Sequence, residues 1–269
     1  MKRVLLAVWG ALAAGAALAD TVLEGKPIQG GLLIGRAAPG SSVTLDGRPL
    51  RASPDGTFAV GFGRDAPAKA VLEIRAPGQE PEVKRLTIAR RKYLVQRIDG
   101  LDEAKVTPPP EVIERIKAEG EAIRETRRRD SVEALFAGGF VWPTTGPISG
   151  VFGSQRVLNG QPRAPHYGVD VAAPVGTPIV APAAGAVALA HPDLYFTGGT
   201  VILDHGHGVT SLYAHMDSVE VKEGQRVTQG ERLGTVGKTG RVTGAHLHWG
   251  MSWFDERLDP ALLVPPMPE

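Results

Sequence analysis

The sequence predicts a mostly β protein, in which an N-terminal immunoglobulin-like β-sandwich, a helical connector and a C-terminal antiparallel β domain follow one another. Three observations support this prediction: short runs that alternate apolar and polar residues, a single stretch with apolar residues at helical spacing, and a final glycine-rich part in which turns separate short β runs. We place the sandwich at residues 20–96, the connector at residues 97–140 and the C-terminal domain at residues 141–269.

The prediction of a sandwich depends on period-2 runs that lie beside strong turn signals. Asp-Gly or Pro-Gly turns adjoin such runs at three places, namely residues 43–47, 55–60 and 71–78. Short strands between turns of this kind are typical of antiparallel β-sandwiches. The region contains no histidine and no group of catalytic residue types.

The connector is expected to contain one helix near residues 111–130. The prolines at 108–110 end any earlier element and favour a helix start. Apolar residues then recur at helical spacing, at Val112, Ile113, Ile116 and Ile123. We assign the basic run at residues 127–129 to a solvated face near the helix C-terminus, where cations suit the helix dipole. An anionic partner is the alternative.

The first residues have the layout of a secretory signal peptide. A basic start at residues 1–3 precedes an apolar run at residues 4–18, and Ala17-Leu18-Ala19 forms a small-x-small cleavage pattern. The run is shorter than the roughly 20 residues that span a bilayer, so we expect cleavage and no stable membrane insertion afterwards. A lipoprotein anchor is excluded, because it requires a cysteine and the chain has none.

Composition restricts the chemistry that the chain can carry out. With 30 basic and 29 acidic residues there is no basic excess of the kind that nucleic acid binding requires. Since cysteine is absent, disulfides and thiolates are excluded, and any metal site must use His, Asp or Glu. All seven histidines lie in residues 141–269. Histidine is a preferred metal ligand and proton carrier near neutral pH.

The strongest local motif is His246-Leu247-His248. On a β-strand the two histidines point to one face, while Leu247 and Trp249 point to the other. Two adjacent imidazoles are costly to bury unless a metal or a proton relay uses their nitrogens. The motif is therefore a candidate site, with an exposed pair of histidines on a strand as the alternative.

Two further motifs are weak alone. In His166-x-x-x-Asp170, Gly168 permits the chain to bend so that both side chains approach one point. His215 ends an alternating run, and alternation places it on the same face as Tyr213. We expect the remaining His205 and His207 to occupy turn or surface positions. Those two flank a glycine before the strand.

Taken together, these residues can form a catalytic zinc site. Such sites typically have three protein ligands and keep a water in the fourth position. His166, Asp170 and one histidine of the strand pair make this set, and spacing does not tell which one. The other strand histidine and His215 then remain for proton transfer and for stabilising an oxyanion.

Residues 141–260 resemble the lysostaphin/LytM-type murein zinc metallopeptidases, which have a duplicated hybrid motif β fold. The matching segments, in chain order, are His166-x-x-x-Asp170, residues 176–182, residues 204–216, residues 237–240, His246-Leu247-His248 and residues 258–260. The resemblance implies that His166, Asp170 and His248 bind Zn²⁺, that His246 acts in proton transfer and that His215 stabilises the tetrahedral intermediate.

The same resemblance implies a function. We expect a zinc metalloendopeptidase that crosses the inner membrane, lies in the periplasm or at the cell wall, and hydrolyses peptide bonds of peptidoglycan, at D,D cross-links. One alternative is a non-catalytic module that binds the wall or activates an amidase. Another is a secreted zinc peptidase that acts on proteins or glycine-rich peptides. The N-terminal sandwich either docks the enzyme or covers its groove.

Overall fold

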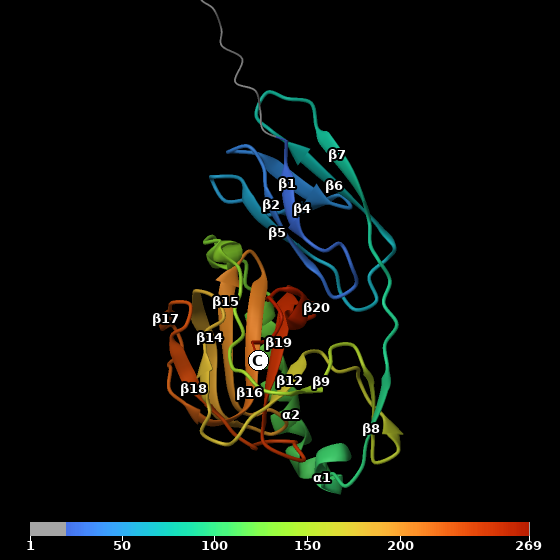
Figure 1. The fold of residues 1–269 in the computed structure, drawn as a ribbon, viewed down its shortest axis with the longest axis vertical. Coiled ribbons are helices and arrows are strands. Elements are labelled where there is room, and N and C mark those ends of the chain that lie inside the picture. Colours follow the sequence, from blue (N-terminus) through green and yellow to red (C-terminus); the bar gives the residue numbers. More distant parts are fainter. Residues whose placement is uncertain (1–19, 269) are drawn as a thin grey trace, which may run out of the picture.

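The computed structural model describes residues 20–268, and two β-rich regions are stacked along the long axis of the molecule (Figure 1). The mostly β fold class expected from the sequence is confirmed. The expected signal peptide, residues 1–19, lies outside the described residues.

No helix within residues 20–268 is both long enough and apolar enough to span a bilayer.

The upper region is a sandwich of two antiparallel sheets. One sheet has the order β1 (Val22–Gly25), β2 (Leu32–Arg36), β5 (Thr57–Gly61). The other has the order β4 (Arg48–Leu50), β3 (Ser42–Leu45), β6 (Lys69–Arg75), β7 (Glu82–Thr87). The alternating apolar residues of both sheets meet in one core, which includes Leu33, Val43, Phe58, Leu72 and Ile74.

The connector begins with a strand that the sequence analysis did not expect. β8 (Val95–Ile98) spans the boundary drawn at residues 96 and 97, and it pairs in parallel with β10 (Gln155–Leu158). β11 (Gln161–Pro162) completes this small sheet. Local sequence does not reveal such a pairing, because its two strands are far apart along the chain. It holds the connector against the C-terminal region.

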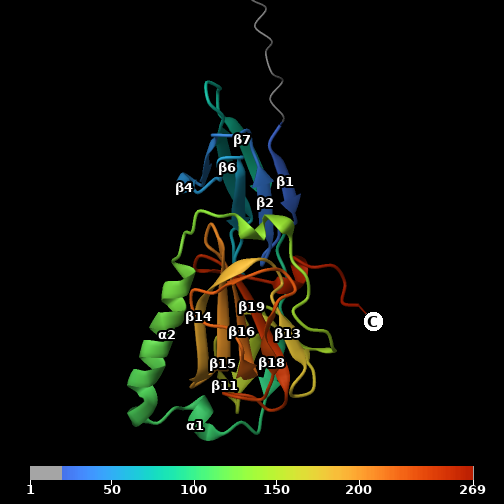
Figure 2. The same ribbon diagram turned by 90° about the vertical axis from the view of Figure 1, so that its left-hand side faces the viewer.

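The helices follow β8. They are α1 (Glu103–Val106), the short 3-10 turn η1 (Pro110–Val112), α2 (Ile113–Arg127) and the 3-10 turn η2 (Leu135–Gly138). The long helix therefore lies where the proline run and the apolar stripe predicted it. Figure 2 shows α2 running beside the large sheet. Ile123 of its apolar stripe packs on a cluster that includes Leu189 and Ile202.

The basic run at the end of α2 is only partly solvated, so the expectation of a solvated face is wrong for one of its members. Arg128 is exposed and pairs with Glu121 and Glu125. Arg127, in contrast, is 8% exposed, and burial lowers its pKa. Its Nε has no hydrogen-bond partner among the described residues.

The C-terminal region is built on a ten-stranded sheet. The main path has the order β17, β14, β15, β16, β19, β12, β9, and β13, β18 and β20 pair beside it. The bounds are β9 (Ile148–Gly150), β12 (Val169–Ala172), β13 (Pro178–Val180), β14 (Gly185–Leu194), β15 (Gly198–Gly206), β16 (Val209–Val219), β17 (Arg226–Val227), β18 (Arg232–Val236), β19 (His246–Trp253) and β20 (Glu256–Leu258), with η3 (Pro260–Leu262) after them. All strand pairings in this sheet are antiparallel.

The sandwich packs against one end of β19. Leu32 and Ala59 of the sandwich belong to the same apolar cluster as Trp253. A Cβ added to Gly61 would lie 2.5 Å from the Cβ of Trp253, so the two regions are in close contact there. An ion pair of 2.7 Å between Arg91 and Asp259 also joins them. The sandwich therefore rests on the C-terminal end of β19, whereas His246 begins that strand.

A candidate metal centre and active site

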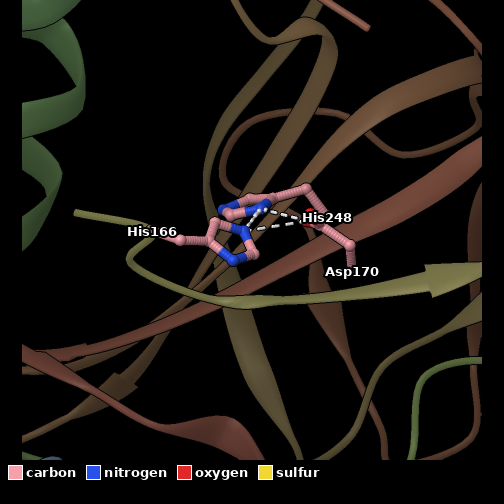
Figure 3. Close-up of side chains that lie close together, drawn as sticks. All are labelled: His166, Asp170 and His248. Atoms are coloured by element: carbon pink, nitrogen blue, oxygen red, sulfur yellow. Dashed lines mark hydrogen bonds and ion pairs between the residues drawn. The ribbon is translucent and has the colours of Figure 1, made fainter. Parts of the chain in front are cut away.

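Three segments bring His166, Asp170 and His248 together (Figure 3). Asp170 of β12 is the direct cross-strand partner of His248 of β19, and the loop before β12 supplies His166. The nitrogen Nε2 of His166 lies 2.9 Å from Oδ1 of Asp170, and Nδ1 of His248 lies 2.8 Å from the same oxygen. The two nitrogens are 3.0 Å apart. One carboxylate oxygen and two imidazole nitrogens thus face a common point.

The hydrogen bonds of His166 indicate that this point suits a cation. Its Nδ1 lies 3.1 Å from the carbonyl oxygen of Val151, which can only accept, so Nδ1 carries the proton. In the neutral ring Nε2 then directs a lone pair at the carboxylate of Asp170. Two acceptors at 2.9 Å repel unless a proton or a metal ion lies between them. The donor set of two imidazoles and one carboxylate fits a zinc-type cation.

Electrostatics keeps these groups in the protonation states that a metal requires. Burial tends to raise the pKa of Asp170, but the close contacts of its carboxylate with His166 and His248 outweigh this effect and hold the pKa far below its usual value. Burial lowers the pKa of His248 to about 4. Near neutral pH the carboxylate is therefore ionised and His248 is neutral, as metal ligands must be.

Arg156 holds the second oxygen of the carboxylate. Its Nη2 lies 2.9 Å from Oδ2 of Asp170, while Oδ1 faces the two histidines. Sequence motifs did not reveal this residue, because an arginine ten positions before His166 has no distinguishing pattern. Partners that orient a ligand in this way are a usual part of metal sites.

Two glycines, Gly168 and Gly150, leave space for the side chains of His248 and Asp170. A Cβ added to Gly168 would lie 2.7 Å from Cε1 of His248, and one added to Gly150 would lie 2.3 Å from Oδ2 of Asp170. Gly168 was expected to permit a bend. Its φ is not in the left-handed region. The structure requires glycine there because an added Cβ would lie 2.5 Å from the carbonyl oxygen of Trp249 as well as against the ring of His248.

Strand alternation around the histidine pair is as predicted. Leu247 and Trp249 are fully buried in the core, and His246 and His248 lie on the opposite face of β19. Nε2 of His246 lies 3.8 Å from Oδ1 of Asp170, farther than the nitrogens of His166 and His248. The distances therefore show that His248 lies nearer to Asp170 than His246 does, which the spacing of the two histidines in the sequence could not tell.

His215 reaches the site through a backbone conformation that alternation does not describe. Alternation placed it with Tyr213, whose side chain is fully buried in the core. His215 instead has a φ of +65°, a left-handed conformation that costs free energy for any residue with a Cβ. A β-bulge follows directly in β16. The ring centroid of His215 lies 4.8 Å from that of His246. The expectation that His215 shares a face with Tyr213 was therefore wrong.

His215 and His246 present the same atom to the site. Nδ1 of His215 donates to the carbonyl of Thr239 at 2.9 Å, and Nδ1 of His246 donates to the carbonyl of Gly244 at 2.9 Å. In the neutral rings Nε2 is therefore free to accept a proton. Burial lowers the pKa of His215 to about 3, so this ring is neutral at physiological pH.

Two pockets adjoin the cluster. The large pocket, about 500 Å³, is bordered by His166, His215 and His248 among others. The small pocket, about 130 Å³, is bordered by Asp170, His215 and His246 among others. His215 therefore lies where the two spaces meet. Within residues 20–268, no sandwich strand borders either pocket, whereas connector residues border both.

Comparison with known proteins places this arrangement in a family. Residues 164–260 match the model of Peptidase family M23. A solved structure from Pseudomonas aeruginosa, assigned to peptidase M23, aligns with a TM-score of 0.67 and 33% identity over 88% of this chain and 94% of that chain. The chain belongs to peptidase family M23. The resemblance drawn from the sequence motifs is thereby confirmed.

Curated relatives of this M23 member match shorter parts of it. Cell division protein DipM of Caulobacter vibrioides is 36% identical over 169 residues, which are 60% of this chain and 26% of DipM. The peptidoglycan DD-endopeptidase ShyA of Vibrio cholerae is 43% identical over 88 residues, which are 32% of this chain and 20% of ShyA. The chain thus spans only 20–26% of the length of these two relatives.

Two other histidines of the M23 region lie away from the cluster, and the expectation of turn or surface positions needs correction. His205 is fully buried on β15, where Nδ1 donates to the carbonyl of Ala184 and Nε2 lies 2.7 Å from Oγ of Ser211. His207 does lie in a turn, but it is only 2% exposed, and its Nε2 is 3.2 Å from Oγ of Ser53 in the sandwich. The sequence missed both burials because each depends on distant segments.

Proposed function

We propose that this chain is a secreted zinc metalloendopeptidase that hydrolyses peptide bonds of peptidoglycan, at D,D cross-links. The observation that carries the proposal is the convergence of His166, Asp170 and His248, whose ligand atoms all lie within 4.8 Å of one another. Membership of the M23 family supports the hydrolase class. The similarity to ShyA, a peptidoglycan DD-endopeptidase, supports this substrate and this bond.

In this proposal His166, Asp170 and His248 would hold Zn²⁺. Zinc bound by three protein ligands polarises a carbonyl and lowers the pKa of a water. Val151 and Arg156 contribute by orientation: the carbonyl of Val151 fixes the tautomer of His166, and Arg156 holds the carboxylate of Asp170.

His246 and His215 are proposed to handle the proton and the developing charge. His246 takes the proton of the attacking water at Nε2 and passes it to the leaving amine. The negative charge of the developing oxyanion would raise the pKa of His215, which is low in the free chain, so that Nε2 takes up a proton from solvent and donates a hydrogen bond to the oxyanion. Their Nδ1 atoms cannot serve, because the carbonyls of Gly244 and Thr239 already accept from them. The peptide is proposed to run from the large pocket to the small pocket past His215.

The proposal includes the location. The expected signal peptide, residues 1–19, would direct the chain across the inner membrane to the periplasm or the cell wall. Cleavage after Ala19 leaves residues 20–269 as the mature chain. Peptidoglycan is then the substrate that the mature chain meets.

The test uses the mature chain with purified muropeptide dimers, with and without a chelator. Mass spectrometry should show conversion of cross-linked dimers to monomers, loss of this activity on chelation and recovery with zinc. His246→Ala should abolish cleavage, and the exposed His191→Ala should not. A zinc-loaded chain that binds murein without cutting it would contradict the hydrolase and favour the wall-binding or amidase-activating module. Cleavage of proteins or glycine-rich peptides alone would contradict the peptidoglycan substrate.

A further inference from the structure

Arginines dominate the charged residues of the large pocket. Four of them border it, namely Arg156, Arg163, Arg241 and Arg257. They come from separate segments of the chain: β10, the loop before β12, the loop before β19, and β20. Among the described residues, no aspartate or glutamate borders this pocket. Two of the four, Arg156 and Arg241, also border the small pocket.

These cations act on one another. Burial lowers the pKa of Arg241, and the charges of Arg156 and Arg163 lower it further. Burial likewise lowers the pKa of Arg156 and brings the pKa of Arg257 to about 10. Like charges gathered in a partly desolvated space destabilise one another, and an anion that enters the space relieves this repulsion.

Arg156 pairs with Asp170 at 2.9 Å, and neutral groups contact the side chains of the other three arginines. Nη2 of Arg163 donates to the carbonyl of Val106 at 2.9 Å. The guanidinium of Arg257 lies 5.5 Å from the centroid of the Tyr167 ring, and that of Arg241 lies 4.5 Å from the centroid of the Phe196 ring. Such contacts help to orient a guanidinium.

The loop that carries Arg241 is itself fixed in position. The backbone N–H of Arg241 donates to the carbonyl of Phe196 at 2.8 Å. Thr239 of the same loop accepts from His215 through its carbonyl, at 2.9 Å. Arg241 is therefore held at a set distance from the histidines of the site, at the junction of the two pockets.

We propose that the large pocket recognises a carboxylate of the peptide substrate, and that Arg241 is the residue that binds it, with Arg163 beside it. This inference deepens the proposed function and rests on it. Arginine binds carboxylates through paired, charge-assisted hydrogen bonds, and Arg241 borders the spaces on both sides of the cluster. A carboxylate bound there places the neighbouring peptide bond at the histidines.

Two sources can supply such a carboxylate: the C-terminal α-carboxylate of the peptide, or the carboxylate of an acidic residue within it. The test compares three forms of one cross-linked muropeptide: fully free, amidated at the C-terminus, and amidated at the internal acidic residue. Cleavage is measured as kcat/KM. Binding to the His246→Ala chain is measured by calorimetry.

We expect amidation at one of the two positions to lower both kcat/KM and affinity by about 10-fold or more, the size of a charge-assisted hydrogen bond. Arg241→Gln should lower kcat/KM on the free peptide by a similar factor and leave the responsive amidated form unchanged. Arg241→Lys should restore part of the preference. The matched control is Arg226→Gln, an exposed arginine that borders neither pocket, and it should have no effect. If Arg241→Gln fails to fold, Arg163→Gln should reduce the preference in its place.

The outcomes separate this inference from the proposed function. If the wild-type chain cuts and binds the free peptide and both amidated peptides equally, the carboxylate subsite is overturned while the endopeptidase remains intact. Equal losses on free and amidated peptides in Arg241→Gln would overturn it as well. A chain that cuts none of the peptides but binds the free form at least 10-fold more tightly, through Arg241, would support the subsite and contradict the enzyme.

Discussion

Asp170 and His248 are directly paired on the antiparallel strands β12 and β19, and Oδ1 of Asp170 lies 2.8 Å from Nδ1 of His248. The register of one strand pair therefore positions two of the three candidate ligands. Because a shift of one residue would turn either side chain to the other face, the site depends on the same contacts that bury Leu247 and Trp249. Folding of the core and assembly of the cluster are coupled.

Gly168→Ala tests the close approach of the backbone to His248. The added Cβ would lie 2.5 Å from the carbonyl oxygen of Trp249 and 2.7 Å from Cε1 of His248, so the backbone of β19 or the His248 ring must shift relative to Asp170. We expect the apparent zinc affinity to fall by about 10-fold or more, the usual effect of disturbing the orientation of a ligand. Competition with a chromogenic chelator measures it. Gly138→Ala is the control, because nothing lies within 4 Å of a Cβ there. Unchanged affinity in Gly168→Ala would contradict the steric argument.

Substitutions at His215 test the backbone strain. With a φ of +65°, position 215 favours glycine over alanine by about 1 kcal/mol. Urea unfolding should therefore show His215→Gly to be more stable than His215→Ala, although both variants lose the imidazole and with it the cleavage of muropeptides. Equal stability, or a more stable alanine variant, would mean that the left-handed conformation does not persist in solution.

His205 should make stability depend on pH. Burial lowers its pKa to about 4 in the folded chain, from an ordinary value of 6.5 for histidine. Between these values the unfolded chain binds a proton that the folded chain does not, so the free energy of unfolding falls as pH decreases from 6.5 towards 4, by on the order of 3 kcal/mol. Below the folded pKa the loss levels off.

Urea denaturation across this pH range checks the prediction for His205. His205→Gln should reduce the slope of stability against pH, while the exposed His191→Gln should leave the slope as it is. A slope that is identical in wild type and His205→Gln would show that this histidine is not the group responsible.

The ion pair of Arg91 and Asp259 should stabilise the contact between the sandwich and the large sheet. The side chain of Asp259 is only 5% exposed, so Arg91→Met leaves a buried carboxylate without its cation. We expect a loss of about 3 kcal/mol in the free energy of unfolding, with partial recovery when Asp259→Asn is added. Thermal and urea unfolding measure it. The exposed pair of Arg226 and Glu133 provides the control, since Arg226→Met should change stability by about 0.5 kcal/mol or less.

Local patterns in the sequence predict the elements that local physics determines. The period-2 runs predicted the sandwich strands, the proline run and apolar stripe predicted α2, and i, i+2 spacing predicted that His246 and His248 share a face. Local patterns did not predict features that depend on contacts between distant segments. The parallel pairing of β8 with β10, the burial of His205 and the contact of Arg156 with Asp170 all join segments that no local pattern connects.

The site residues show the same division. Imidazoles at i and i+2 on a strand indicate a shared site, but which of them lies nearer Asp170 depends on the register of β12 with β19. For His215 the local pattern gave the wrong face, because its positive φ breaks the alternation from which the face was inferred. From the sequence, only the resemblance to a known family indicated that His248 is the ligand of the strand pair and that His215 belongs to the site.

The most direct test of the central claim is the metal content of the purified mature chain and of matched variants, measured by mass spectrometry of the metal. Wild type and His246→Ala should each carry one zinc ion per chain, because His246 is not among the three proposed ligands. His166→Ala, Asp170→Ala and His248→Ala should each lose the zinc while remaining folded by circular dichroism. Zinc bound at wild-type occupancy in folded His248→Ala would contradict the account.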